Sequence, residues 1–245
     1  MNQHDSTPSR PRRMQPRVAL RALKTLIADP DDTAQVFVII RALSGNSLQR
    51  GFKRFRQMPL GQTVLRDQRD LIDVLKDRER MHAFPAGTLG HAYHSFIQTE
   101  QLTADGLVAA SMNDDPDAQV QDPDLERYAT RIRDMHDLWH TVTEYGRDEI
   151  GELCLLAFTY AQTRNRGIGV IVLMGAYNIH RALGRGVLRS VSRAFRAGRK
   201  ARWLPGEDWE ALLEQPIDDV RRHLRIDEPI AYQALLDGLA YQPSR

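Results

Sequence analysis

The sequence predicts an all-α protein, a single-domain multi-helix bundle that holds a metal site between two consecutive helices. Apolar residues recur at helical spacing along almost the whole chain, and the alternation typical of strands is nearly absent. Asp, Ser, Pro and Gly stand where such helices would begin and end. With 245 residues, 42% apolar and 27% charged, the chain is long enough for one large core. We expect a disordered basic tail over residues 1–17, the helical domain over residues 18–226 and a peripheral segment over residues 227–245.

The domain is predicted to begin with short helices. Apolar spacing indicates one helix over Val18–Ile27 and another over Val36–Leu43, which Gly45 would end. Ser47 is a suitable cap for a short third helix. The helical pattern continues over Leu71–Glu79, where the many charges are explained by a solvated face.

A loop and a long helix are expected in the middle of the chain. Phe84–Gly90 is a loop by its proline and glycine content, and it leads into a helix that carries Tyr93. An acidic, proline-bearing stretch over Ala104–Asp124 then separates two helical halves without defining a second domain. Beyond it, one helix is predicted from about Leu125 to Tyr145, and the next runs to about Gln162.

The stretch His136-Asp137-Leu138-Trp139-His140 is the strongest candidate for a functional site. On a helix, His136 and His140 leave the same face one turn apart and can share one ion, and Asp137 can add an oxygen ligand or orient an imidazole. In one unbroken helix, Glu152 would lie roughly 18 Å from His140 along the axis. However, the segment Glu144–Asp148 offers a glycine stop and an aspartate cap, so two helices packed across a turn would return Glu152 to the histidines. The spacing alone leaves a chance pair of surface or core histidines as the alternative.

The motif H-D-x-x-H, eleven residues and then E, resembles the signature of the coenzyme Q biosynthesis protein 4 family. Flanking segments extend the resemblance over residues 18–226. These segments are Phe84–Tyr93, Arg131 with Arg133, Gly151–Leu153, Trp209 with Glu210, and Arg221 with Leu224. The chain departs from the family at Leu89, where phenylalanine is frequent, and at Ile132, where tyrosine is frequent. Both departures leave the expected ligands intact and concern the substrate pocket.

The resemblance implies a role in ubiquinone biosynthesis, by metal-dependent (oxidative) decarboxylation at ring C1 of a polyprenylated 4-hydroxybenzoate-type intermediate. The protein would then be a carbon–carbon lyase. The expected ligands of its divalent metal are His136, Asp137, His140 and Glu152. Zinc suits this nitrogen-and-oxygen set, and iron or manganese are alternatives. The candidates for handling the proton are Asp134, Tyr93 and His94.

Three other functions are alternatives to this one. The family resemblance also implies a non-catalytic, lipid-binding scaffold that organises ubiquinone-biosynthesis enzymes at the membrane. A zinc protease of the H-E-x-x-H type is disfavoured, because aspartate is one methylene too short to place a general base near the metal-bound water. Phosphohydrolases with an HD pair are disfavoured, because their ligands are scattered and lack a histidine one turn later, but they remain a minor alternative because an all-helical chain fits that class.

A basic helix is predicted between Arg181 and Arg202, within a stretch from His180 to Trp203 that contains no acidic residue. The arginines form a stripe beside an apolar one: Arg181, Arg185, Arg189, Arg193 and Arg196. Such a helix is typical of a membrane-surface or anionic-partner contact, and a subunit contact is the alternative. Nucleic acid is not expected, because no recognition motif accompanies the charge.

The remaining expectations concern partners and location. The partners would be a polyprenylated aromatic lipid, the membrane surface, other ubiquinone-biosynthesis proteins and a second copy of the chain. Cys154 is the only cysteine and is expected to be a small buried residue, so a reducing compartment is allowed. The first residues lack a secretory apolar core, and the longest apolar run, Ile168–Tyr177, is too short to cross a bilayer. We therefore expect a bacterial cytoplasmic protein that is peripheral to the inner membrane.

Overall fold

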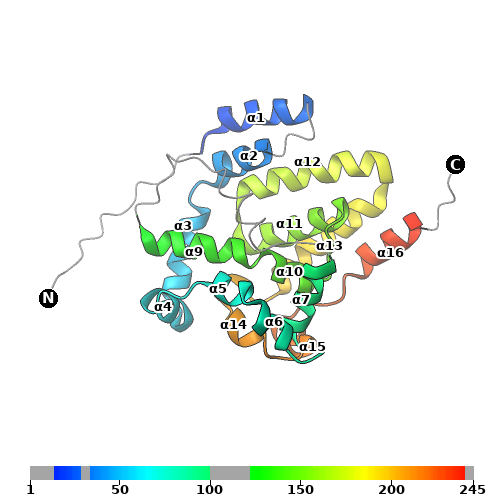
Figure 1. The fold of residues 1–245 in the computed structure, drawn as a ribbon. Coiled ribbons are helices and arrows are strands. Elements are labelled where there is room, and N and C mark those ends of the chain that lie inside the picture. Colours follow the sequence, from blue (N-terminus) through cyan, green and yellow to red (C-terminus); the bar gives the residue numbers. More distant parts are fainter. Residues whose placement is uncertain (1–13, 29–33, 100–121, 241–245) are drawn as a thin grey trace.

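The computed structural model of the protein describes residues 14–28, 34–99 and 122–240, and in them every element longer than an isolated bridge is a helix (Figure 1). In the N-terminal half these are α1 (Pro16–Ala28), α2 (Ala34–Ser44), α3 (Ser47–Arg56), α4 (Pro59–Arg66), α5 (Leu71–Lys76), α6 (Arg78–Ala83) and α7 (Leu89–Thr99). In the C-terminal half these are α9 (Pro123–Asp134), α10 (His136–Thr143), α11 (Glu149–Thr163), α12 (Arg166–Leu183), α13 (Arg185–Lys200), the 3₁₀ turn η1 (Leu204–Gly206), α14 (Trp209–Leu212), α15 (Ile217–Leu224) and α16 (Ile230–Ala240). The predicted all-α fold is confirmed.

Helix α11 runs through the centre of the molecule, packed against both α12 and α13. It is apolar around most of its circumference, which is the pattern of a buried helix, and Leu153, Leu155 and Phe158 are almost inaccessible. Helix α13 approaches it closely at Gly198, where an added Cβ would lie 2.6 Å from the Phe158 carbonyl oxygen. On the other side of α12 lie α2 and then α1, which form the upper layer in Figure 1.

A second, smaller core lies where α3, α4 and α9 meet. Phe55 and Tyr128 are buried there, with ring centroids 5.2 Å apart. Asp122 caps α9 by accepting hydrogen bonds from the amides of Asp124 and Leu125. This cluster anchors α9, and α9 leads directly into the candidate site.

The predicted loop before α7 is present and is held by the segment that precedes α15. The amides of Leu89 and Gly90 donate to the carbonyls of Gln215 and Leu213, at 2.9 Å each. An added Cβ at Gly90 would lie 2.3 Å from the Phe84 ring, so the position needs glycine. These bonds fix the start of α7, which contacts α10.

The long helix predicted from about Leu125 to Tyr145 is wrong, because the structure divides it into α9 and α10 at Met135. The side chain of Met135 is fully buried in the main core, and the turn at this residue starts a new helix at His136. The prediction that Gly146 ends this helix is also wrong. Helix α10 ends at Glu144 in the left-handed conformation (φ +57°), and the Glu144 carboxylate pairs with Arg221 at 2.8 Å.

The basic helix predicted as one unit is likewise divided. Gly184, at φ +82°, lies between α12 and α13 and adopts a conformation that favours glycine. Arg181 therefore belongs to α12, whereas Arg185, Arg189, Arg193 and Arg196 belong to α13. The predicted stripe does not continue across Gly184.

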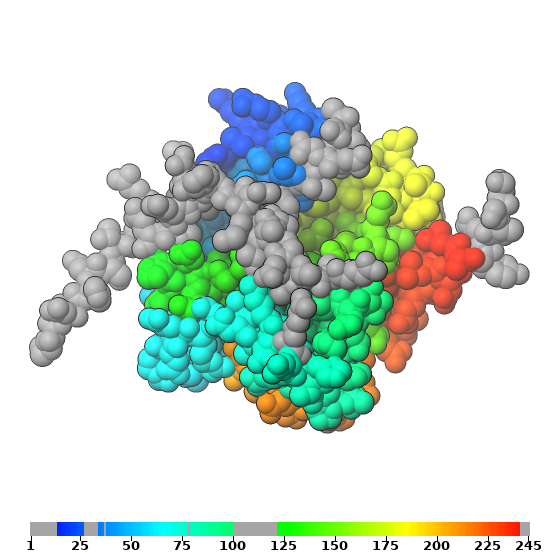
Figure 2. Space-filling view, in the orientation of Figure 1, coloured from blue at the N-terminus to red at the C-terminus, as the bar shows by residue number. Residues whose placement is uncertain are grey.

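The two ends of the described chain are more ordered than the sequence suggested. Residues 1–13 of the predicted tail lie outside the described residues, but Pro16 and Arg17 already belong to α1. Within the segment expected to be peripheral, α16 contributes Tyr232 to the main core and forms the edge of the molecule in Figure 2. Within residues 14–28, 34–99 and 122–240, none of the helices combines the length and the hydropathy of a membrane-spanning segment.

Candidate metal centre

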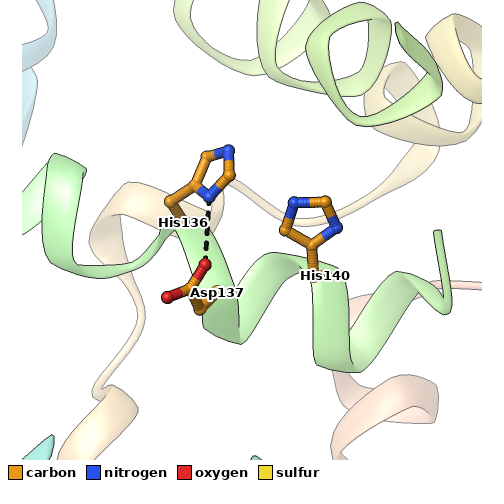
Figure 3. Close-up of side chains that lie close together, drawn as sticks. All are labelled: His136, Asp137 and His140. Carbon is orange, nitrogen blue, oxygen red and sulfur yellow. Dashed lines mark hydrogen bonds and ion pairs between the residues drawn. The ribbon is translucent and has the colours of Figure 1, made fainter. Parts of the chain in front are cut away.

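His136 and His140 lie on one face of α10, as their spacing predicted (Figure 3). Their ring centroids are 4.7 Å apart, with the rings inclined at 72°. Potential ligand atoms of His136, Asp137 and His140 all lie within 4.8 Å of one another. The cluster is half-buried at His136 and buried at Asp137 and His140, so it faces the interior from the start of α10.

The imidazole of His140 is held in one tautomer. Its Nδ1 lies 2.7 Å from the carbonyl oxygen of Tyr145, which can only accept, so Nδ1 carries the proton. In the neutral imidazole, the form that binds a metal, the other nitrogen, Nε2, presents a lone pair. This atom is buried and has no hydrogen-bond partner among the described residues. A buried lone pair without a partner, fixed by a backbone carbonyl, is the arrangement that metal-binding histidines commonly have.

His136 is oriented by its neighbour in the sequence. Its Nδ1 lies 3.2 Å from Asp137 Oδ1, and a carboxylate can only accept from it (Figure 3). The His136 Nε2 atom is then free to act as a ligand, and it lies 3.9 Å from Glu152 Oε2. Asp137 thus lies where it can orient the imidazole or contribute an oxygen ligand itself.

Glu152 returns to the histidines across a turn, as the sequence predicted. Its Oε1 lies 3.4 Å from His140 Nε2. The return depends on Asp148, which caps α11 by accepting from the amides of Ile150 (3.1 Å) and Gly151 (3.0 Å). Glu152 therefore stands in the first turn of α11, where the helix dipole favours negative charge.

The charge of Glu152 is set by opposing effects. Burial raises the pKa of its carboxyl, but His140, His136 and Arg147 lower that pKa by more, so it falls below its usual range. The Arg147 Nε atom lies 3.6 Å from Oε1. Glu152 is therefore ionised at neutral pH, as an oxygen ligand for a metal must be.

Arg221 supports α10 from a distant part of the chain. Its guanidinium donates to the carbonyl oxygens of Val142 (3.1 Å) and Thr141 (3.3 Å), at the end of the helix where carbonyls lack intrahelical partners. The same group pairs with Glu144. The sequence pattern included Arg221 but did not indicate this contact, because nothing local relates α15 to α10.

Two of the three candidate acids lie beside the cluster. Asp134 is buried, accepts from Arg133 at 3.2 Å, and leaves Oδ2 without a hydrogen bond in the described chain. Burial raises the pKa of its carboxyl. The pKa of Tyr93 is raised by burial first and then by the charges of Asp137 and Asp134, so its phenol stays protonated.

His94 is placed differently from its neighbour Tyr93. Consecutive residues leave a helix about 100° apart, and His94 faces Gln98 (3.2 Å) and the ring of His82 (centroids 5.6 Å apart). The contacts described for it do not include the metal-ligand candidates. The structure therefore does not bring His94 into the cluster.

Arg131 and Glu210, which also belong to the family pattern, contact each other. Arg131 is almost fully buried and forms two parallel hydrogen bonds to Glu210, at 2.7 and 2.6 Å. This pair ties α9 to α14, next to the site. Sequence reasoning did not predict it, because the partners are separated by 79 residues.

The basic residues of α13 are exposed. Within the described ranges, Arg185, Arg189, Arg193 and Arg196 show no ion pair with a carboxylate. On α12, the guanidinium of Arg181 lies over the Tyr177 ring, 5.9 Å from its centroid. These positive charges are therefore available to an anionic surface or ligand.

Together, two imidazole nitrogens and two carboxylates converge on one small region. This donor set could hold zinc, and iron or manganese also accept nitrogen and oxygen ligands. The buried lone pair at His140 Nε2 is the observation that fits a metal best, because a purely structural histidine would normally be hydrogen-bonded there.

The sequence matches the profile of one known protein family. Residues 11–230 match the sequence profile described as coenzyme Q (ubiquinone) biosynthesis protein Coq4. The mitochondrial ubiquinone biosynthesis protein coq4 of Schizosaccharomyces japonicus is 28% identical over 172 residues, which is 69% of this chain and 68% of that protein. The mitochondrial COQ4 homolog of Danio rerio is 30% identical over 188 residues, 72% of this chain. Those 188 residues are 63% of the Danio rerio protein, so this chain spans less than two thirds of that relative's length.

A solved structure shares the fold. The crystal structure of a candidate ubiquinone biosynthesis protein from Nostoc punctiforme PCC 73102 superposes with a TM-score of 0.65. The alignment covers 86% of this chain and 98% of that one, at 20% sequence identity. At this identity the likeness supports the helical architecture alone.

Proposed function

Because the chain belongs to the Coq4 family of coenzyme Q (ubiquinone) biosynthesis proteins, we propose that it is a metal-dependent decarboxylase of that pathway. Its substrate would be a polyprenylated 4-hydroxybenzoate-type intermediate, which loses the carboxylate at ring C1. The single observation that carries the proposal is the fixed, unpartnered Nε2 of His140 beside Glu152.

The proposed ligands are four side chains on α10 and near the start of α11. Nε2 of His136 and of His140, with carboxylate oxygens of Asp137 and Glu152, would hold the divalent metal. When bound, the metal would supply a Lewis acid that binds substrate oxygen and stabilises developing negative charge. The hydrogen bond from His140 to the Tyr145 carbonyl and the cap at Asp148 would keep these ligands in position.

The proposed donor of the proton that adds to ring C1 is Asp134. Burial raises the pKa of this carboxyl, and its Oδ2 atom has no hydrogen bond within the described chain, so Asp134 is the candidate proton donor. The proton adds to C1, the carboxylate leaves as carbon dioxide, and the electron pair of the broken bond stays in the ring. Tyr93, which also stays protonated, would donate a hydrogen bond to a substrate oxygen. If a hydroxyl replaces the carboxylate, a two-electron oxidant is needed as well, and an anaerobic assay separates the two outcomes.

The location would be cytoplasmic and peripheral to the inner membrane, because a polyprenylated substrate must be taken up from a bilayer. Two features support this. The arginines of α13 are exposed, and two large apolar side chains stand one turn apart on α12, Leu173 (73% exposed) and Tyr177 (60% exposed). Exposed basic and apolar side chains of these two kinds suit contact with an anionic membrane surface.

A non-catalytic scaffold is the second candidate function. The same exposed pair, Leu173 and Tyr177, could instead contact another ubiquinone-biosynthesis protein or a second copy of this chain. A scaffold would bind the lipid without cleaving it, so it would depend on this surface and not on the metal ligands.

The test is complementation of a strain that lacks its own gene for this protein. Glu152→Gln should accumulate a polyprenyl intermediate that retains the C1 carboxylate, detected by mass spectrometry of lipid extracts. Glu149→Gln, an exposed change in the same first turn of α11, is the matched control and should restore normal quinone levels. Normal quinone in the Glu152→Gln strain would reject the decarboxylase and favour the scaffold.

A further inference from the structure

A groove lies between α13 and α16, and apart from Tyr145 its lining residues have no role in the proposed metal centre. Its volume is about 830 Å³. This is within the range of roughly 300–1,000 Å³ that is common for small-molecule sites. The buried side chains of Tyr145 and Tyr232 line its inner end, and Ser190 on α13 donates to the carbonyl of Ala231 on α16 at 2.9 Å. The two helices are therefore joined beneath the groove.

One wall of the groove is strongly basic. Arg189, Arg193 and Arg196 are spaced by four and three residues, so they stand on one face of α13. All three are exposed, and none forms an ion pair within the described chain. Lys200, further along, is already paired with Asp227. Glu228 also lines the groove, so the three arginines outnumber the one carboxylate of the lining that has no ion pair in the described chain, and the groove keeps a net positive charge that favours an anionic ligand.

On the opposite side, Asp227 and Glu228 stand before α16, and the wall that α16 itself forms is largely apolar. Ile230, Ala234 and Leu235 of α16 line it, and Ile230 is 69% exposed, so most of its apolar surface is open to a ligand. An inorganic anion would use only the arginines and leave this wall bare. A ligand that carries both an anionic group and a hydrocarbon chain would use both walls.

We propose that this groove binds a single anionic phospholipid, with the phosphate at Arg189, Arg193 and Arg196 and the first part of an acyl chain along Ile230 and Leu235. The site is separate from the metal centre and does not depend on the proposed reaction. The two sites nevertheless share a wall, because Tyr145 lines the groove and its carbonyl accepts from His140.

The test titrates the full-length protein with dihexanoyl phosphatidylglycerol below its micelle concentration, followed by calorimetry. The double variant Arg189→Gln/Arg193→Gln should bind at least about tenfold more weakly, because two charge-assisted hydrogen bonds are lost. The matched control is Arg185→Gln/Arg199→Gln, which removes the same charge from exposed positions of α13 outside the groove. Its affinity should stay within about twofold of the wild type, as expected for distant exposed charges.

Two further measurements test whether the ligand is an anionic lipid. Ile230→Ser should weaken binding of the lipid but not of inorganic phosphate, and dihexanoyl phosphatidylcholine should bind more weakly than the anionic lipid. Equal weakening by the two arginine pairs would overturn the groove and leave only a diffuse basic surface. Phosphate that binds as tightly as the lipid would overturn the lipid assignment. Absence of binding in the wild type would overturn the site altogether.

Discussion

Replacing Tyr232 by Phe removes one hydroxyl from the joint between α16 and the turn that precedes α11. That hydroxyl donates to Asp148 Oδ2 and accepts from the Gly146 amide at 3.0 Å. Phenylalanine fills the same space, so the ring keeps its contact with Tyr145, at 5.6 Å between centroids. The substitution therefore isolates the polar part of the joint.

The magnitude follows from the groups that lose a partner. Asp148 is exposed, so water can replace the hydroxyl there, whereas the partly buried Gly146 amide is left without its acceptor. An unsatisfied buried group costs about 1–3 kcal/mol, and we expect a loss in unfolding free energy near the lower end, about 1–2 kcal/mol. For a chain of this size, that corresponds to a decrease in Tm of roughly 2–8 °C.

The assay combines thermal unfolding with amide hydrogen exchange. The exchange protection of Ile150 and Gly151 should fall, because their amides are capped by the Asp148 carboxylate that Tyr232 holds. Tyr177→Phe is the matched control, since Tyr177 is 60% exposed, and it should melt with the wild type. If Tyr232→Phe also melts with the wild type, or if protection at the start of α11 is unchanged, the proposed role of α16 is wrong.

Three further predictions address packing, pH and reactivity. Gly151→Ala should destabilise the protein by about 1–3 kcal/mol, because its Cβ would lie 2.1 Å from the Gly146 carbonyl oxygen. Burial raises the pKa of the Glu210 carboxyl, but Arg131 lowers that pKa by more. The pKa of Glu210 in the folded state therefore lies below its pKa in the unfolded state. The stability that Glu210 contributes is then complete above the unfolded pKa and is lost as the pH falls through the folded pKa. The difference in unfolding free energy between wild type and Glu210→Gln should therefore shrink from about pH 5 downward, measured by urea denaturation. Burial raises the pKa of the Cys154 thiol to about 12, so a thiol reagent should label the protein only after denaturation.

Each of these predictions has its own control. Gly238→Ala, where an added Cβ meets nothing within 4 Å, should be neutral or slightly stabilising in α16. Equal effects of the two glycine changes would contradict the packing argument. A pH-independent difference for Glu210→Gln would show that its pKa is not lowered by folding. Rapid labelling of native Cys154 would show that α11 opens more readily than its packing suggests.

The sequence was most informative where the relevant contacts are local. The spacing of His136 and His140 determined that they share a face, and the Asp148 cap determined where α11 begins. Together they bring Glu152 back to the histidines, which required only a turn of ordinary length. Cys154 was correctly predicted to be buried, because it follows Glu152 on the apolar part of the same helix.

Contacts between distant segments were not predictable in this way. Nothing in the local pattern relates Arg221 to the carbonyls at the end of α10, or Arg131 to Glu210. The same limit explains why the segment that carries Tyr232 was expected to be peripheral: its short apolar pattern does not reveal a partner 84 residues earlier. The predicted helix boundaries were wrong at Met135 and Gly184. The apolar pattern continues across both residues, but the chain turns there, with Met135 buried and Gly184 at a positive φ.

The central claim, that His136, Asp137, His140 and Glu152 hold a divalent metal, is tested most directly by metal analysis of the purified protein. The wild type should contain a stoichiometric divalent metal by elemental mass spectrometry. His140→Ala should lose it while its circular dichroism keeps most of the helical signal. His94→Ala, a histidine whose described contacts are Gln98 and His82, should keep full occupancy. Full metal occupancy in His140→Ala, or a wild type that takes up no metal when it is supplied, would contradict the account.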